Sequence, residues 1–181
     1  MDLRIKRTKN SIINAFIELR SKKPIEKITV KELSELAFIN KATFYSHYRD
    51  IYDLSEQLED EVISSVLNNI PHPDSIITNP KQGVEELTIA LASQSKLFHI
   101  LFSDTRSSLF ASKLEQGIRK QIYIQHPEYE KQLEWDILLS FCIQGGVHAF
   151  LSHAQNDNIS EISKILSNVN DCLFKNYAFI L

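Results

Sequence analysis

The stretch ITVKELSELAFINKATFYSHYRDIYDL, residues 28–54, decides the fold of this chain. Thr29 and Glu32 have the spacing of a capping box, in which each side chain accepts a hydrogen bond from the other residue's backbone N–H, so a short helix is expected to begin at Val30. Asn40 is a second capping residue and predicts a third helix over residues 41–48. Two short helices joined by a three-residue turn are typical of a helix-turn-helix, whose second helix enters the major groove of DNA.

The sequence on both sides of this stretch also has helical periodicity. Apolar residues recur at three- and four-residue steps over residues 3–20, and Asp50 can cap a long fourth helix that ends before Pro71. Further helices are predicted from Pro80, and over residues 95–102, 104–124, 127–154 and 159–179. The expected fold is all-α with about nine helices: a three-helix head, residues 1–49, joined by the fourth helix to a helical body, residues 50–181.

The charges are distributed unevenly between these two parts. Residues 1–49 contain eleven Lys or Arg against five Asp or Glu, whereas residues 50–181 contain nine against eighteen. A basic head on an acidic body would direct one face of the protein toward phosphates. No apolar stretch approaches the roughly 20 residues that a membrane span needs, and the N-terminus does not read as a signal peptide, so a cytoplasmic protein is expected.

The sequence offers little for enzymatic or metal chemistry. Cys142 and Cys172 match neither a disulfide framework nor a zinc motif, and both are expected to be small buried apolar side chains. His148 and His153 are five residues apart and do not have the spacing of helical zinc ligands. Catalytic triads, glycine-rich phosphate loops and paired carboxylates are not evident, so we expect no enzyme, no cofactor and no metal site.

Residues 28–54 resemble the N-terminal signature of the tetracycline-repressor (TetR) family. The match is carried by Thr29-Val30, Leu33, Ala37, Ile39, Lys41-Ala42-Thr43-Phe44-Tyr45, His47-Tyr48 and Asp53-Leu54. The resemblance implies a transcription regulator, most simply a dimeric repressor that binds a pseudo-palindromic operator in double-stranded DNA and is released by a small-molecule effector. Residues 1–49 would then be the DNA-binding domain, and residues 50–181 the regulatory and dimerisation domain.

The resemblance also implies which residues contact DNA. Lys41 can reach a guanine edge or a phosphate, the methyl groups of Ala42 and Thr43 can touch a thymine methyl, and Tyr45 and His47 can donate to phosphates. The full set of candidates is Thr29, Lys31, Lys41, Ala42, Thr43, Tyr45, Ser46 and His47, with Arg4, Lys6 and Lys9 from the first helix. Alternatives remain open, because Thr29 can serve as a helix cap alone, Tyr45 can pack in the core, and the basic first helix can be merely solvated.

Two positions depart from the family pattern. Phe38 occupies the turn position where glycine is usual and a left-handed backbone is favoured, so the turn is expected either to differ slightly from the family's or to be mildly strained. Ile51 replaces a lysine that grips a phosphate in many members, which predicts weaker DNA binding unless Tyr52 or Arg49 substitutes.

The last two predicted helices match the segments that form a four-helix dimer interface in this family. The candidate interface residues are Ile137, Phe141, Gly145, Ile162, Ile165, Leu166, Val169 and Leu173, and the alternative is that they are internal core. Candidates for an effector pocket are Phe98, Leu101, Phe102, Phe110, Tyr123, Trp135, Phe141 and His148, and here too ordinary core packing is the alternative. A second hypothesis for the whole chain is a co-regulator or adaptor whose body binds another protein.

Overall fold

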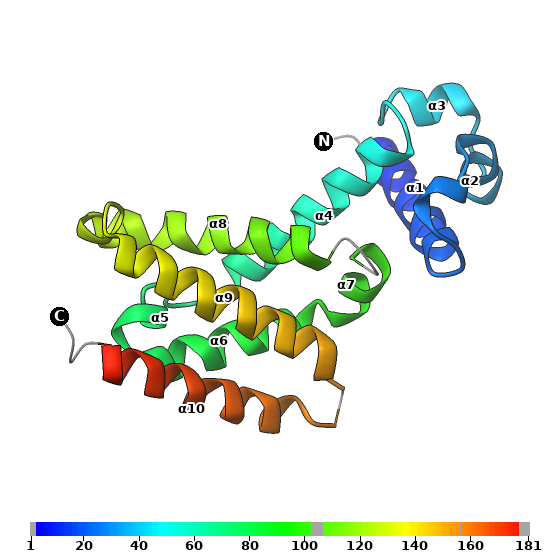
Figure 1. The fold of residues 1–181 in the computed structure, drawn as a ribbon. Helices are drawn as coiled ribbons and strands as arrows, with labels where there is room; N and C mark the ends of the chain where they lie inside the picture. The colour runs from blue at the N-terminus through cyan, green and yellow to red at the C-terminus, as the bar shows by residue number, and fades with distance from the viewer. Residues whose placement is uncertain (1–2, 103–106, 156, 178–181) are drawn as a thin grey trace. The chain divides into compact units, whose positions relative to one another are not determined.

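The computed structural model describes residues 3–102, 107–155 and 157–177, and these residues form helices and connecting segments without any strand (Figure 1). The α-helices are α1 (Leu3–Arg20), α2 (Val30–Leu36), α3 (Lys41–Tyr45), α4 (Ile51–Asn68), α5 (Ser75–Thr78), α6 (Pro80–Ser93), α7 (Ser95–Leu101), α8 (Ser107–Gln125), α9 (Leu133–His153) and α10 (Ile159–Tyr177). Short 3-10 turns cover Ile25–Lys27 and Pro127–Tyr129. The predicted all-α fold is confirmed, and α5 is the one α-helix that was not expected.

Several predicted helices differ in their bounds or extend beyond the described residues. Residues 104–106 and 178–179, expected at the ends of two helices, lie outside the described residues. The predicted helix over 127–154 is instead a 3-10 turn followed by α9, because the chain is extended at Gln132. This bend brings the ring centroid of Tyr129 to 4.4 Å from that of Trp135.

The chain divides into two compact units, and the division falls inside α4. The N-terminal unit comprises the described residues up to Val62 together with residues 96–102, which include most of α7. Its core is formed by the apolar faces of α1 to α4 and by α7, where the rings of Phe98 and Phe102 stack with centroids 5.2 Å apart. The buried apolar residues of α1 are Ile12, Ala15, Phe16 and Leu19, which recur at helical spacing. Ile5, at the start of the apolar pattern, is exposed.

The C-terminal unit comprises the described residues 63–95, 107–155 and 157–177. Within it α10 packs along α6, α8 packs along α9, and α5 packs against the start of α6. Gly83 on α6 allows the last of these contacts, because a Cβ there would lie 2.5 Å from the backbone nitrogen of Ile76. The interior contains Phe110, Leu114, Ile118 and Ile122 of α8, which recur every four residues and are all completely buried.

A hydrogen-bonded cluster joins α8 to α9, and we call it the α8–α9 polar network: Glu115, Arg119, Asp136, Ser140 and Gln144. The Glu115 carboxylate accepts from Arg119 at 2.8 Å, from Ser140 at 2.7 Å and from Gln144 at 2.7 Å. Burial raises the pKa of Glu115, but these hydrogen bonds and the guanidinium outweigh it and hold that pKa below the ordinary range. The network is therefore charged at neutral pH and fixes the register of the two helices.

The two cysteines differ in their surroundings. Cys142 on α9 is buried, as expected, and burial raises its pKa to about 11, so it remains a neutral thiol. The expectation of a buried side chain is wrong for Cys172, which is exposed on α10. The neighbouring turn of that helix buries Asn170 and Phe174 instead, which leaves Cys172 on a different side.

No helix within the described ranges is long and apolar enough to cross a lipid bilayer.

Candidate nucleic-acid interface

Helix α2 begins at the predicted cap. The Thr29 side chain accepts a hydrogen bond from the backbone N–H of Glu32 at 3.2 Å, as the capping box requires. The reciprocal half of the prediction is wrong, because the Glu32 carboxylate pairs with the ammonium of Lys23. A full positive charge competes better for this carboxylate than a neutral backbone amide does. The Thr29 oxygen serves as acceptor in this cap, so its hydroxyl proton remains able to donate to a phosphate.

The turn after α2 ends the helix in a Schellman motif centred on Phe38. The N–H of Ile39 donates to the carbonyl of Ser34 at 3.0 Å, and the N–H of Phe38 donates to that of Glu35 at 3.2 Å. Phe38 has a φ of 57°, the one positive φ recorded for a non-glycine residue in the described chain. Of the two expectations for this turn, a changed conformation or a mildly strained one, the left-handed backbone at Phe38 agrees with the second. Its side chain is 95% exposed, so packing does not offset the backbone strain.

Helix α3 begins at Asn40, whose side-chain oxygen accepts from both the N–H and the hydroxyl of Thr43, at 2.7 and 2.9 Å. The helix ends at Tyr45 and not at Tyr48 as predicted. The Ser46 hydroxyl donates to the carbonyl of Thr43 at 2.7 Å, a local bond of the kind that competes with continuation of a helix. The candidate recognition helix is therefore short, and its contact residues lie in its first turn and at its end.

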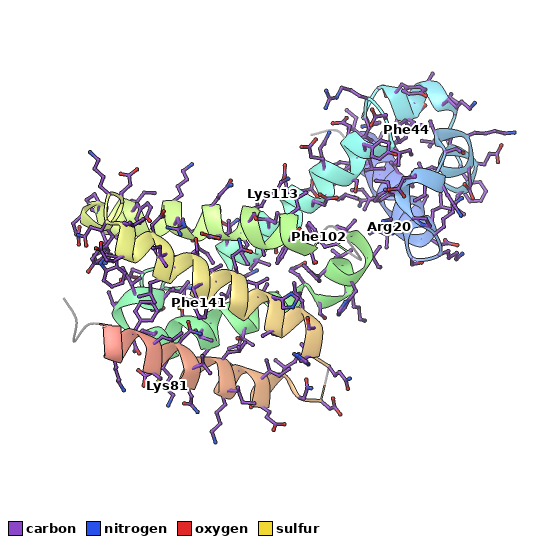
Figure 2. The ribbon with its side chains drawn as sticks, in the orientation of Figure 1. Arg20, Phe44, Lys81, Phe102, Lys113 and Phe141 are labelled. Atoms are coloured by element: carbon purple, nitrogen blue, oxygen red, sulfur yellow. The ribbon has the colours of Figure 1, made fainter. Side chains whose placement is uncertain are left out.

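The two faces of α3 have opposite character. On the buried side, Phe44 of α3 (labelled in Figure 2) packs against Tyr48, which follows the helix. Their ring centroids are 5.8 Å apart, and the buried pair anchors α3 in the N-terminal unit. Burial, followed by the nearby Glu61 and Asp53 carboxylates, raises the pKa of Tyr48 to about 12, so it is a neutral core residue. Tyr45 is 56% exposed, which excludes the alternative that it belongs to the core.

The other candidate contacts are mostly at the surface. Lys9 is an exception, because its ammonium pairs with the Glu61 carboxylate on α4 at 2.9 Å and is already engaged within the unit. Thr43 and His47 are half-buried. The exposed candidates are Arg4, Lys6, Thr29, Lys31, Lys41, Ala42, Tyr45 and Ser46. They belong to the start of α1, the start of α2 and the length of α3.

The start of α4 is tightly fixed. Asp50 accepts from the N–H of Asp53 at 2.8 Å, and Asp53 accepts from the N–H of Arg49 at 2.8 Å. The Arg49 backbone bond is the main reason why the pKa of Asp53 is lowered. Ile51 is buried and contributes to the core, while the Arg49 guanidinium is paired with Asp53. Of the two substitutes considered for the missing lysine, Tyr52 is the one whose exposed side chain is not held in this pairing.

The residues expected to line an effector pocket are dispersed. Phe98, Leu101 and Phe102 are buried in the N-terminal unit, and Phe110 is buried inside the C-terminal unit. Phe141 and His148 are exposed on α9. Tyr123 does not line the larger cavity of the C-terminal unit. It lies beside Arg119 in a smaller one. Trp135 alone of the eight lines the larger cavity.

This cavity has a volume of about 690 Å³ and lies in the C-terminal unit. It is formed where the α5–α6 junction, the start of α9 and the end of α10 meet, and its lining residues are Ile77, Thr78, Asn79, Pro80, Lys81, Trp135, Leu138, Asp171, Phe174 and Lys175. Sequence reasoning missed nine of these ten. The sequence gives no signal for them, because a cavity made by the ends of three helices leaves no periodic pattern in any one of them.

Four of the residues expected at a dimer interface are exposed large apolar side chains of α9 and α10. Ile137 is 60% and Phe141, labelled in Figure 2, is 65% exposed on α9. Ile165 and Val169 are exposed on α10. Leu133 extends the stripe on α9, so we define the α9–α10 apolar face as Leu133, Ile137, Phe141, Ile165 and Val169. Gly145 is exposed on the same helix, with open space where a Cβ would be. Ile162, Leu166 and Leu173 are half-buried.

Comparison with models of known protein families gives no match, and no curated protein matches the sequence. Among the residues that the structure describes, no group of three or more His, Cys, Asp or Glu side chains could hold a metal ion.

Proposed function

We propose that this chain is a sequence-specific DNA-binding transcription regulator of the TetR type, acting as a dimeric repressor that a small-molecule effector releases. The observation that carries the proposal is that α3 is anchored by buried aromatic residues and exposes polar and basic ones. Two aromatic residues, Phe44 and Tyr48, anchor the helix in the core, while Lys41, Ala42 and Tyr45 remain exposed beside the capped start of α2.

The exposed groups suit the two kinds of contact that DNA recognition needs. Lys41 and Ala42 lie at the start of α3, the part of a recognition helix that meets base edges. Thr29 and Lys31 begin α2, and Arg4 and Lys6 begin α1, where they can bind phosphates. The net positive charge of residues 1–49 would draw this surface to DNA, and the acidic remainder would orient the encounter.

Dimerisation is supported by the α9–α10 apolar face. The exposed apolar side chains recur at four-residue steps on each helix, a pattern that favours an interaction surface, and a two-fold pair of these helices would bury them. A symmetric dimer would present two copies of α3 to the two halves of a pseudo-palindromic operator. The second copy of this chain is therefore the partner that we propose for this face.

The DNA-binding proposal is tested by mobility shift or footprinting on DNA that flanks the chain's own gene. Replacement of Lys41 and Tyr45 together by alanine is expected to weaken binding by about 100-fold or more, because each lost contact costs roughly 1–3 kcal/mol. The matched control replaces Lys131 and Lys164 by alanine, which removes charge from the C-terminal unit, and binding should change little. Full binding by the Lys41/Tyr45 variant would disprove the assignment of α3 as the recognition helix.

The dimer is tested with two variants of the same kind. Ile137→Asp places a charge on the α9–α10 apolar face and is expected to give a monomer in light-scattering or sedimentation measurements. Ile124→Asp changes an isoleucine of α8 that is 74% exposed but lies outside this face, and should leave the dimer intact. A monomeric unmodified chain would instead favour the co-regulator alternative, in which another protein covers the face.

A further inference from the structure

The cavity at the meeting of α6, α9 and α10 has an apolar floor and a polar rim. Leu138, Phe174 and Ile77 are buried and form its floor, and the half-buried Trp135 forms part of its wall. The ring centroids of Trp135 and Phe174 are 6.0 Å apart, which makes one continuous aromatic surface. A volume of about 690 Å³ with such a lining is in the range of small-molecule sites.

The charged groups of the rim do not cancel. Lys175 pairs with Asp171 at 2.6 Å, so these two side chains together carry no net charge. Lys81 also lines the cavity and is exposed, and its ammonium has no carboxylate within ion-pair distance among the described residues (Figure 2). Counted over the described residues, the lining therefore carries one positive charge that no carboxylate pairs with.

Lys81 is attached to a fixed part of the backbone. Its carbonyl oxygen accepts a hydrogen bond from the hydroxyl of Ser167, a completely buried residue of α10, at 3.3 Å. Gly83 holds the same end of α6 against α5. The cation is thus tethered beside the aromatic wall, although its side chain remains able to follow a ligand.

We propose that this cavity binds a monoanionic organic acid with an aromatic or aliphatic body. The body lies against Trp135, Leu138 and Phe174, where it is removed from water, and the acid group pairs with Lys81. A neutral compound of the same shape would lack the ion pair, and a cation would be repelled by Lys81. This acid would be the effector of the regulator proposed above. Its role as an effector rests on that proposed function, whereas its binding to the cavity does not.

The test uses two fluorescent probes with the same ring system. 1-Anilinonaphthalene-8-sulfonate carries one negative charge, and N-phenyl-1-naphthylamine is its neutral counterpart. Each is titrated into the 181-residue chain in the absence of DNA. Trp135 is the chain's only tryptophan, so quenching of its emission reports directly on occupancy near the cavity wall.

Lys81→Met keeps most of the aliphatic stem and removes the charge. It is expected to weaken binding of the anionic probe by about tenfold, the loss expected for one hydrogen bond to a charged group, and to leave the neutral probe unchanged. Lys81→Arg should retain binding of the anion. The matched control, Lys164→Met, removes an exposed lysine of α10 outside the cavity and should affect neither probe.

Two results would overturn the proposal: anion binding that is unchanged in Lys81→Met, or an equal loss for both probes. Tryptophan quenching and probe emission should saturate at the same probe concentration. If they do not, the probe occupies another surface and the proposal is contradicted. Failure of the operator-binding test would leave these titrations untouched, so the two proposals can fail separately.

Discussion

Replacement of Phe38 by glycine is expected to stabilise the protein, although it removes a large apolar side chain. Phe38 has a φ of 57° and is 95% exposed, so the native state loses almost no burial when the ring is removed. An L-residue in the left-handed region costs roughly 1–2 kcal/mol, and glycine avoids that cost. Glycine is also more flexible in the unfolded chain, which costs roughly 0.5–1 kcal/mol. The difference predicts a gain of about 0.5–1 kcal/mol.

The assay is urea or thermal unfolding followed by far-ultraviolet circular dichroism. For a chain of this length the expected gain corresponds to a rise in melting temperature of about 1–4 °C. Phe38→Ala is the matched control, because it removes the same ring but keeps the Cβ that makes the left-handed backbone costly. It should therefore be close to neutral. Equal effects of glycine and alanine would mean that the backbone at Phe38 is not strained. Destabilisation by both would mean that the Phe38 ring makes packing contacts that stabilise the fold.

Three further results are expected. Gly83→Ala should destabilise the C-terminal unit by roughly 1–3 kcal/mol in urea unfolding, because its Cβ would meet backbone, whereas Gly117→Ala should cost less because it meets only a leucine side chain that can rotate. Glu115→Gln should cost about 2 kcal/mol at neutral pH, and the difference from the unmodified protein should fade in acid. Because the pKa of Glu115 is lower in the folded than in the unfolded chain, its charge stabilises the fold at pH values above the unfolded pKa, about 4.3. This stability is lost as the pH falls through the folded pKa. A difference between the two proteins that stayed constant down to low pH would refute the charged role of Glu115. Lys41→Ala should make the dependence of operator affinity on salt shallower by about one unit of slope if Lys41 contacts a phosphate, and leave the slope unchanged if it contacts only a base.

The sequence by itself determined the local architecture of the candidate interface. The caps at Thr29, Asn40 and Asp50 and the buried pair Phe44 and Tyr48 were all predictable, as was the strain at Phe38 as one of two alternatives. Each depends on hydrogen bonds or side-chain spacings within a few residues, so the information lies in a short window of sequence. One error in the same region arose where a more distant group competed, because Lys23 takes the carboxylate of Glu32. The other, the early end of α3, has a local cause in the bond from the Ser46 hydroxyl to the Thr43 carbonyl.

The tertiary structure alone decided which apolar residues of the C-terminal unit are core, surface or cavity. Phe110 and Phe141 have the same chemistry in the sequence, yet one is completely buried and the other is 65% exposed. The cavity joins Lys81 to Trp135 and Phe174, which are far apart along the chain. Helical periodicity shows that a helix has an apolar face, but what covers that face depends on the helices that pack against it, and this long-range packing is not written in any local pattern.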